Sequence, residues 1–269
     1  MEQAPQVPSR LSQVTAIEAN LFALFSLLRG WPQLEVHDDP DLLWIISDIP
    51  FPLFNSLLRA NLPPSRADAA IEEAIARCRS RHVPMLWWTG PATRPADLET
   101  RLAAKGFHGE ENRGMVALLG ALPKDPPMPA GLVVEQVTDL KALTQWCKVL
   151  CAGFEMPEFA GEAFFDLSRS LGLVPDLPLR NYLGWLEGAP VATSSLFLGG
   201  GAAGIFNVAT LPRARRRGVG SAMTSTPLHE ASAEGYQVAI LHSSEMGVGV
   251  YRNLGFEEHC TIGQFVWTG

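Results

Sequence analysis

The segment TLPRARRRGVGSAM, from Thr210 to Met223, holds the most informative pattern in this chain. Pro212 stops the apolar stretch before it, an arginine-rich run follows, and Gly218 and Gly220 open a helical pattern. Glycines let backbone N–H groups approach a ligand closely, and the amino end of a helix carries a partial positive charge. Arginine side chains bind phosphate oxygens through paired hydrogen bonds. The segment therefore predicts an anion-binding site.

Other ligand-binding patterns fit this loop less well. A P-loop requires a lysine after its second glycine, and no lysine stands there. A dinucleotide fingerprint requires a third glycine, which is missing from the residues Ser221 to Met223. Nucleic-acid sites usually interleave aromatic residues, and this run has none. A solvated run of charge remains the alternative, above all for Arg213 alone.

The bulk composition is that of a folded globular protein. The 269 residues are 47% hydrophobic and 18% charged, and the formal net charge is -7. That balance argues against a nucleic-acid partner and is compatible with a cationic substrate. The cysteine spacing favours buried thiols in a reducing cytosol over a disulfide framework or a zinc site, so we expect no bound metal. The four cysteines are Cys78, Cys147, Cys151 and Cys260.

Neither a targeting signal nor a membrane span is expected. The first ten residues, MEQAPQVPSR, lack the basic and apolar regions of a signal peptide. No stretch reaches the roughly 18 uninterrupted apolar residues of a spanning helix. We therefore expect a cytoplasmic protein without a membrane partner; the oligomeric state cannot be inferred from the sequence.

The segment GALPKDPPMPAG at 120–131 divides the chain, because its prolines and glycines cannot continue a helix or a central strand. We predict an N-terminal domain at 1–122, a linker at 123–130 and a C-terminal domain at 131–269. Apolar alternation and helical periodicity predict the elements of the C-terminal part. They are strands at 131–137, 180–188, 189–200, 203–211, 236–244 and 260–267, and helices at 138–154, 157–173, 218–234 and 247–256.

The N-terminal part repeats the second half of that order more faintly. Two helices end alike, in RLAAKGF at 101–107 and YRNLGF at 251–256, which favours an internal duplication. We expect Trp87 and Trp88 to pack in the core or between the halves. The expected elements are strands at 42–49, 83–90 and 113–119, and helices at 65–82 and 95–107.

Pro227 falls inside the helix expected after the arginine loop. It removes the backbone hydrogen bond to the carbonyl of Met223, so we expect a kink or a short first segment there.

The arginine loop resembles the acetyl-CoA pyrophosphate loop of the GNAT superfamily of acyl-CoA-dependent N-acetyltransferases, whose pattern is R/Q-x-x-G-x-G/A. The match runs from Arg215 to Gly220 and is preceded, as often in the family, by Pro212. YRNLGF resembles the family's late helix, and YQVAILHSS stands at its fifth strand. The resemblance covers about residues 131–267. It implies an α+β fold of two GNAT-like domains, each a twisted, mostly antiparallel sheet flanked by helices, the N-terminal one a degenerate copy.

The resemblance also implies which residues bind acetyl-CoA, the co-substrate. Val208 would direct its N–H at the acetyl carbonyl, Ala209 and Thr210 would lie along the pantetheine arm, which would add to the strand edge like a further strand. Ser244 stands where the family often has an asparagine that contacts pantetheine. The pyrophosphate would be bound by the backbone N–H groups of Arg215, Arg216, Arg217, Gly218, Val219, Gly220 and Ser221.

Tyr251 is the candidate catalytic residue. A phenol with a pKa of about 10 stays protonated near neutral pH and can donate its proton to a departing thiolate. The resemblance implies a position beside the acetyl sulfur. The alternative is that the ring of Tyr251 only packs against the core.

No general base is assigned. Gly204 stands where several members of the family have a glutamate. Water-mediated proton loss is possible, and each polar candidate has a structural role as its alternative. The candidates are Glu155, Glu158, Asp166 and His242.

We therefore expect an enzyme, an N-acetyltransferase that moves an acetyl group from acetyl-CoA to a primary amine of a small molecule, or to a protein amine. The amine would attack directly, without a covalent enzyme intermediate. Two alternatives stay open: a non-catalytic module that binds or senses acyl-CoA, and an acyltransferase that uses a longer acyl-CoA. The N-terminal part lacks the loop pattern, and we expect it to bind no acyl-CoA productively.

Overall fold

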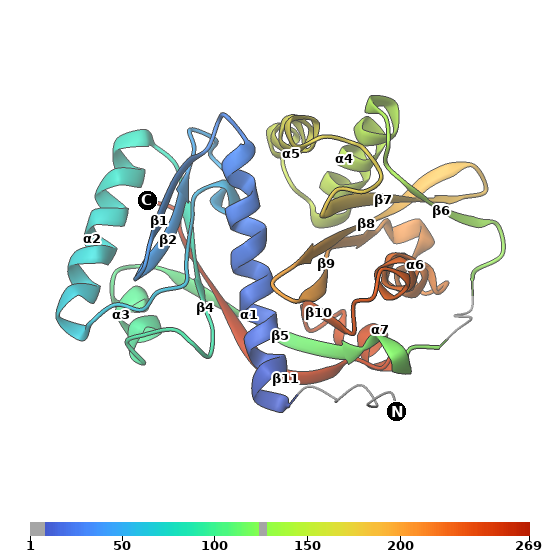
Figure 1. The fold of residues 1–269 in the computed structure, drawn as a ribbon. Coiled ribbons are helices and arrows are strands. Elements are labelled where there is room, and N and C mark those ends of the chain that lie inside the picture. The colour runs from blue at the N-terminus through green and yellow to red at the C-terminus, as the bar shows by residue number, and fades with distance from the viewer. Residues whose placement is uncertain (1–8, 124–127) are drawn as a thin grey trace.

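A computed structural model describes residues 9–123 and 128–269, so part of the predicted linker, 124–127, lies outside the described residues. The strands form one mixed sheet with helices on both faces (Figure 1). The strands are β1 (Glu35–Asp39), β2 (Leu42–Ile46), β3 (Ser56–Leu58), β4 (Met85–Thr89), β5 (His108–Leu118), β6 (Leu132–Gln136), β7 (Leu179–Leu186), β8 (Ala189–Gly199), β9 (Ala202–Thr210), β10 (Val238–Ser243) and β11 (Glu257–Trp267). The 11 strands lie in the order β1-β2-β3-β4-β11-β5-β10-β9-β8-β7-β6.

Every helix and strand predicted from the sequence is present, with ends shifted by a few residues. The structure adds α1, β1 and β3, which the sequence patterns did not predict. The α-helices are α1 (Arg10–Leu27), α2 (Pro64–Arg81), α3 (Leu98–Ala104), α4 (Leu140–Phe154), α5 (Glu158–Leu171), α6 (Val219–Ala233) and α7 (Val248–Asn253). Short 3-10 turns are η1 (Leu28–Gly30), η2 (Pro52–Phe54), η3 (Leu119–Ala121) and η4 (Pro212–Ala214).

The last strands of the two halves change places. β5, the last strand before the linker, pairs with β10, and His242 lies opposite Gly114. β11, the last strand of the chain, lies between β5 and β4, with Phe265 opposite Trp87 (Figure 1). Each half thus completes the sheet of the other. The predicted division into 1–122 and 131–269 stays a prediction, since the sheet continues across it.

Helix α1 lies between the two halves (Figure 1). Its apolar side chains, such as Leu21 and Phe25, belong to a core cluster that includes Trp88 of the N-terminal half and Trp146 of the C-terminal half. The rings of Phe25 and Trp88 meet edge to face, with centroids 6.0 Å apart. The segment Arg10–Gly30 is also long and apolar enough to cross a membrane by length and composition. In this structure it serves as a packing layer between the halves.

Two buried polar residues fix α1 in place. The Asn20 side chain donates to the backbone carbonyls of Gly199 and Ala202, at 2.7 and 2.9 Å, and so binds α1 to the β8–β9 turn. Two residues earlier along α1, the carboxylate of Glu18 accepts from the backbone N–H of Ala92 at 3.0 Å. Burial raises the pKa of Glu18. One helix therefore bonds to both halves.

Two further clusters complete the core. One lies between the sheet and α6 and α7 and includes Met223 and Phe256. The other lies between the N-terminal strands and α2 and α3 and includes Ile71 and Trp87. Trp87 is 0% exposed and Trp88 is 7% exposed, which confirms the predicted packing of both tryptophans.

Pro227 lies inside α6, which runs unbroken through it, so the predicted short first segment is wrong. The carbonyl of Met223 loses its helical partner to the proline and accepts a hydrogen bond from the buried Ser194 hydroxyl of β8 at 2.7 Å instead. A buried carbonyl without any partner would cost free energy, so this bond from the sheet replaces the one that the proline removes.

Candidate active site

Strands β9 and β10 form a fork. They pair in parallel only over residues Ala203 to Ile205 of β9. The last pair is Ile205 of β9 opposite Leu241 of β10. Beyond that pair, the remainder of β9 has only β8 as a neighbouring strand among the described residues. Its free edge faces the opening between the two strands. An extended ligand can add to such an edge through main-chain hydrogen bonds.

A β-bulge shapes β9 just beyond the fork. Ser195 lies opposite Phe206 and Thr193 opposite Ala209, so two residues of β9 face one of β8. Within the bulge, Asn207 has a positive φ of 54° and its carbonyl accepts from the Thr193 hydroxyl at 2.8 Å. Bulges bend a strand and redirect its backbone groups. This bulge therefore sets the direction of the backbone at Val208, the residue predicted to face an acetyl group.

The arginine loop follows β9 and leads into α6. Arg216 and Gly218 adopt left-handed conformations, with φ of 58° and 79°, and α6 begins at Val219. The first backbone hydrogen bond of α6 runs from the N–H of Ala222 to the carbonyl of Gly218, at 3.1 Å. Between Arg216 and Ser221 no backbone N–H donates to any group in the part of the chain that the structure describes. Such a row of free donors is the usual anion-binding feature of a helix amino end.

The loop meets the end of β9 at Thr210. A Cβ atom on Gly220 would lie 3.8 Å from the Thr210 hydroxyl, so the two elements meet there without crowding. The arginine side chains are exposed. Arg215 donates through Nε to the Thr210 carbonyl at 2.9 Å, and Arg213 donates to the Pro190 carbonyl at 3.0 Å. Arg217 lies 3.6 Å from the carboxylate of Glu187. The loop therefore carries exposed positive charge, although the whole chain is acidic.

The β9 residues predicted to bind acetyl-CoA differ in how far their side chains are exposed. Val208 and Thr210 are partly exposed, whereas Ala209 is 5% exposed. A Cβ atom on Gly153 of α4 would lie 2.6 Å from the Ala209 side chain, so α4 packs directly on it. Only the backbone of Ala209 is left for a ligand. Its small side chain lets α4 close over this face of the strand.

Tyr251 lies on α7, on the face of the sheet that α6 also covers. Its ring contacts Phe256 edge to face, with centroids 6.1 Å apart, and lies against Gly247. Burial raises the pKa of Tyr251 to about 12, so the phenol stays protonated near neutral pH. Packing of the ring and a role for the hydroxyl are thus compatible. Ser244 is exposed at the end of β10, and its carbonyl accepts from the Gly247 N–H at 2.9 Å.

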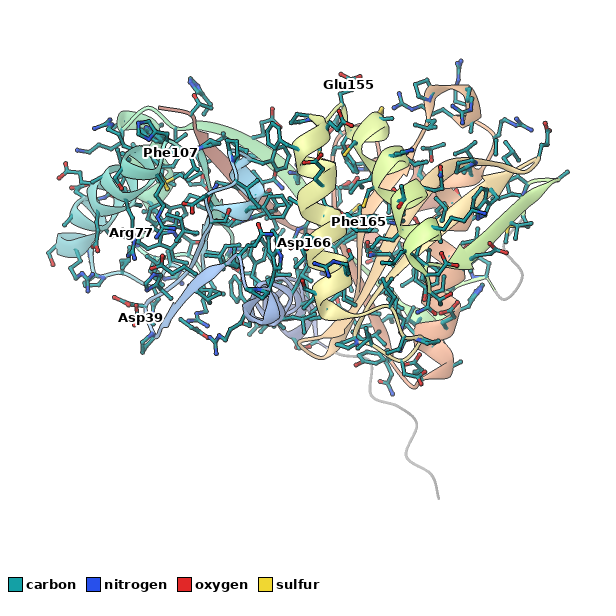
Figure 2. All side chains as sticks on the ribbon, turned by 90° about the horizontal axis from the view of Figure 1, so that it is seen from above. Asp39, Arg77, Phe107, Glu155, Phe165 and Asp166 are labelled. Carbon is teal, nitrogen blue, oxygen red and sulfur yellow. The ribbon has the colours of Figure 1, made fainter. Side chains whose placement is uncertain are left out.

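Asp166 has a structural role. Its carboxylate accepts hydrogen bonds from Trp31 Nε1 at 2.9 Å, Gln33 Nε2 at 2.7 Å and Arg169 at 2.6 Å. The Trp31 bond, with help from Arg169, holds the pKa of Asp166 below its usual range. Figure 2 shows Asp166 on the side of α5 that faces the N-terminal half. Asp166 therefore joins the two halves. Because its carboxylate already accepts these hydrogen bonds, it is not available as a general base.

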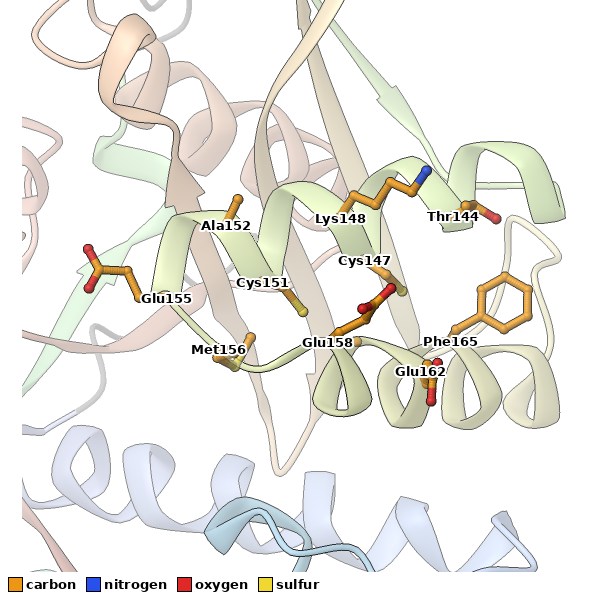
Figure 3. A pocket seen from close by; sticks show the side chains of 11 residues that line it. Thr144, Cys147, Lys148, Cys151, Ala152, Glu155, Met156, Glu158, Glu162 and Phe165 are labelled. Atoms are coloured by element: carbon orange, nitrogen blue, oxygen red, sulfur yellow. The ribbon is translucent and has the colours of Figure 1, made fainter.

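Glu155 and Glu158 line a cleft of about 670 Å³ between α4 and α5 (Figure 3). Neither carboxylate forms a hydrogen bond or ion pair with the described residues. Figure 3 shows that α4 contributes Cys147 and Cys151 to the same cleft. Burial raises the pKa of Cys147 to about 12, so this thiol stays protonated. The cleft thus offers free carboxylates but no reactive thiolate.

His242 lies at the fork, one residue beyond the last parallel pair. Its ring lies between Trp88 and Phe206, with centroids 6.2 and 6.0 Å away. Its Nε2 atom is buried and has no hydrogen-bond partner in the described residues. Burial lowers the pKa of His242 to about 4, so the ring is neutral at physiological pH. A buried nitrogen without a partner calls for a ligand or water contact.

Helix α1 leaves no space for a side chain at Gly204, the position where several GNAT members have a glutamate. A Cβ atom on Gly204 would lie 2.1 Å from Asn20 Oδ1. Any side chain at Gly204 would collide with α1, so the glycine is required by packing. The sequence could not reveal this, but the polar pair Glu18 and Asn20 within the apolar stretch 16–25 was a signal that α1 makes specific contacts.

Comparison with known proteins shows which fold this chain has. The model of a GNAT acetyltransferase domain matches residues 201–259, from β9 through α7 into β11. The fold is similar to that of a GCN5-related N-acetyltransferase from Kribbella flavida, with a TM-score of 0.71 and 18% identity over 93% of this chain and 96% of that one. The chain has the GNAT acetyltransferase fold. This confirms the predicted mixed α/β class and the resemblance read from the loop.

The GNAT likeness extends over almost the whole chain. A GCN5-related N-acetyltransferase from Sphaerobacter thermophilus is 14% identical, with a TM-score of 0.65, over 97% of this chain and 94% of its own. A tandem GNAT protein from the clavulanic acid biosynthesis pathway is 15% identical, with a TM-score of 0.55, over 97% and 95%. A sequence search of curated proteins finds no match. The GNAT fold supports acyl transfer in general.

Proposed function

We propose that this protein is an N-acetyltransferase that moves an acetyl group from acetyl-CoA to the primary amine of a small molecule. The observation that carries the proposal is the row of free backbone N–H groups from Arg216 to Ser221, at the amino end of α6 and beside the end of β9. Coenzyme A is a polyanion, and free N–H groups, a helix terminus and exposed arginines all favour its pyrophosphate.

The residues fit the co-substrate. Gly218 adopts a conformation that a larger residue strains to reach, and a Cβ atom on Gly220 would lie in ordinary contact with Thr210, at 3.8 Å. The free edge of β9 suits an extended pantetheine arm, with Val208, Ala209 and Thr210 as backbone partners. Ser244 at the end of β10 supports the same arm from the other side of the fork.

Acetyl-CoA, when bound, supplies an acetyl thioester whose carbon–sulfur bond breaks as the amine nitrogen takes up the acetyl group. The N–H of Val208 would stabilise negative charge on the acetyl oxygen. The Tyr251 hydroxyl would donate a proton to the departing sulfur, for which its raised pKa keeps it protonated. The amine loses one proton, and the neutral His242 or water would receive it.

Two finer proposals concern the rest of the chain. The N-terminal half would bind no acyl-CoA. Its helix α2 begins at Pro64, directly after Pro63, and no glycine-containing loop like the one before α6 precedes it. The four cysteines are free thiols, which supports a reducing compartment such as the cytoplasm.

A second candidate is a module that binds acyl-CoA without catalysis. The observation in its favour is the closed position at Gly204, which leaves β9 without a carboxylate base. Calorimetry with coenzyme A, followed by a thiol-release assay with acetyl-CoA and a panel of amines, separates the two. If coenzyme A binds but no amine in the panel triggers thiol release from acetyl-CoA, the second candidate is favoured. If thiol is released only from longer acyl-CoA molecules, the acyl donor is one of these and not acetyl-CoA.

A further inference from the structure

A second cavity, of about 170 Å³, lies between α1, η2, α4, α5 and β9. It is distinct from the α4–α5 cleft, since the two share no lining residue. Aromatic rings from several elements surround it. They include Phe25 of α1, Phe54 of η2, Trp146 of α4, Phe164 of α5 and Phe206 of β9.

The cavity adjoins the fork where acetyl transfer is proposed. Phe206 and Asn207, both in the lining, belong to β9 at its bulge. Trp88 and Phe206 in the lining also enclose the ring of His242, whose buried Nε2 has no partner among the described residues. A group held in this cavity therefore contacts two rings that also contact His242, and it lies beside the strand that would carry the acetyl group.

One wall of the cavity is polar but uncharged. Asn207 donates to the Ser195 hydroxyl at 3.0 Å, Ser195 donates to the Asn181 side chain at 2.7 Å, and Asn181 donates to the Ser168 hydroxyl at 3.2 Å. Asn207, Asn181 and Ser168 all line the cavity. No charged side chain in the described residues lines it. An acceptor with several positive charges would be poorly solvated here.

We propose that this cavity binds the hydrophobic body of the acceptor, and that the acceptor is a small primary amine carrying one aromatic or branched aliphatic group. This inference rests on the proposed function and names its substrate class. A dry apolar cavity of about 150 Å³ is large enough to bind benzene, so the size suits one ring. Apolar surroundings lower the pKa of an ammonium group, which favours the neutral amine that attacks.

The test uses the full chain with 2-phenylethylamine, ethylamine and spermidine as acceptors. We expect kcat/KM to be highest for 2-phenylethylamine. Leu24 lines the cavity and is partly exposed, so Leu24→Trp fills the space without opening the core. It should raise the KM for 2-phenylethylamine on the order of 10-fold or more, with the KM for acetyl-CoA unchanged. Leu27→Trp, on the same helix but outside the cavity lining, is the matched control.

Calorimetry with 2-phenylethylamine in the presence of coenzyme A gives a second readout that needs no turnover. Binding that Leu24→Trp weakens and Leu27→Trp does not would support the cavity even if no amine were acetylated, in which case only the proposed function fails. A preference for spermidine that Leu24→Trp leaves intact would overturn the inference and point to the free carboxylates of the α4–α5 cleft. No binding of 2-phenylethylamine to the wild-type protein would overturn it as well.

Discussion

Gly204 and Asn20 lie so close that a Cβ atom at residue 204 would be 2.1 Å from Asn20 Oδ1. The contact joins β9, at the base of the fork, to the helix that bonds both halves of the chain. The same pair explains why the site has no carboxylate at this position.

Gly204→Ala should therefore destabilise the protein, because α1 must shift or Asn20 must give up its bonds. We expect the free energy of unfolding to fall by about 1–3 kcal/mol, as measured by thermal and denaturant unfolding. Gly120→Ala is the control, since nothing lies within 4 Å of its added Cβ. Equal stability of the two variants would contradict the packing argument.

Gly220→Asp should abolish or strongly weaken coenzyme A binding, by at least about 10-fold in Kd by calorimetry, because it adds a negative charge among the free N–H groups. Gly220→Ala is the matched variant, since its Cβ meets Thr210 at an ordinary 3.8 Å. If Asp and Ala at this position bind coenzyme A alike, the loop is not the pyrophosphate site.

Tyr251→Phe removes only the hydroxyl and keeps the ring against Phe256. If Tyr251 is the general acid, kcat should fall by roughly 10²–10⁴, while coenzyme A affinity and Tm change little. The measurement is steady-state turnover with saturating acetyl-CoA and acceptor. Full kcat under conditions where chemistry limits the rate would leave the tyrosine with a packing role only.

His242 should make stability fall in acid. Burial lowers its folded-state pKa from 6.5 to about 4, so the unfolded chain binds this proton more readily. The stabilising contribution of the neutral ring is complete above pH 6.5 and is lost as the pH falls toward 4. Denaturant unfolding at several pH values should give a flatter profile for His242→Gln than for the wild type across this window. Parallel profiles would show that the ring is not held neutral by the fold.

The exchange of β5 and β11 predicts that neither half folds alone. A fragment of 128–269 leaves β10 without β5 and β11 without both of its neighbours, so unpaired edges and the apolar Ile240 would be exposed. We expect low helix and strand content by circular dichroism and no cooperative unfolding. Co-expression with a fragment of 1–123 should restore both. A stable, cooperatively unfolding 128–269 fragment would contradict this.

The local structure around the candidate site was predictable from the sequence because it depends on neighbours in the chain. The loop glycines, the helix after them and the tyrosine of YRNLGF lie within one segment, and their patterns depend on backbone preferences that act locally. The same holds for α2 and α4, whose apolar residues recur at helical spacing.

What escaped the sequence depends on long-range contact. α1 is apolar around most of its surface because it packs between two halves, so it shows little helical periodicity. The roles of Asn20, Asp166 and Ser194 come from partners far along the chain, as with Asp166 and Trp31. No spacing rule predicts such pairs.

The sequence by itself therefore determined most of the helices and strands, the start of a helix after the arginine loop and the resemblance to the GNAT fold, since these follow from short-range backbone and side-chain preferences. Only the tertiary structure decided that the last strands change places, that α1 closes the position at Gly204, and that an aromatic cavity adjoins the fork. These features arise where segments more than a hundred residues apart meet, because packing and hydrogen-bond satisfaction are settled by the whole fold.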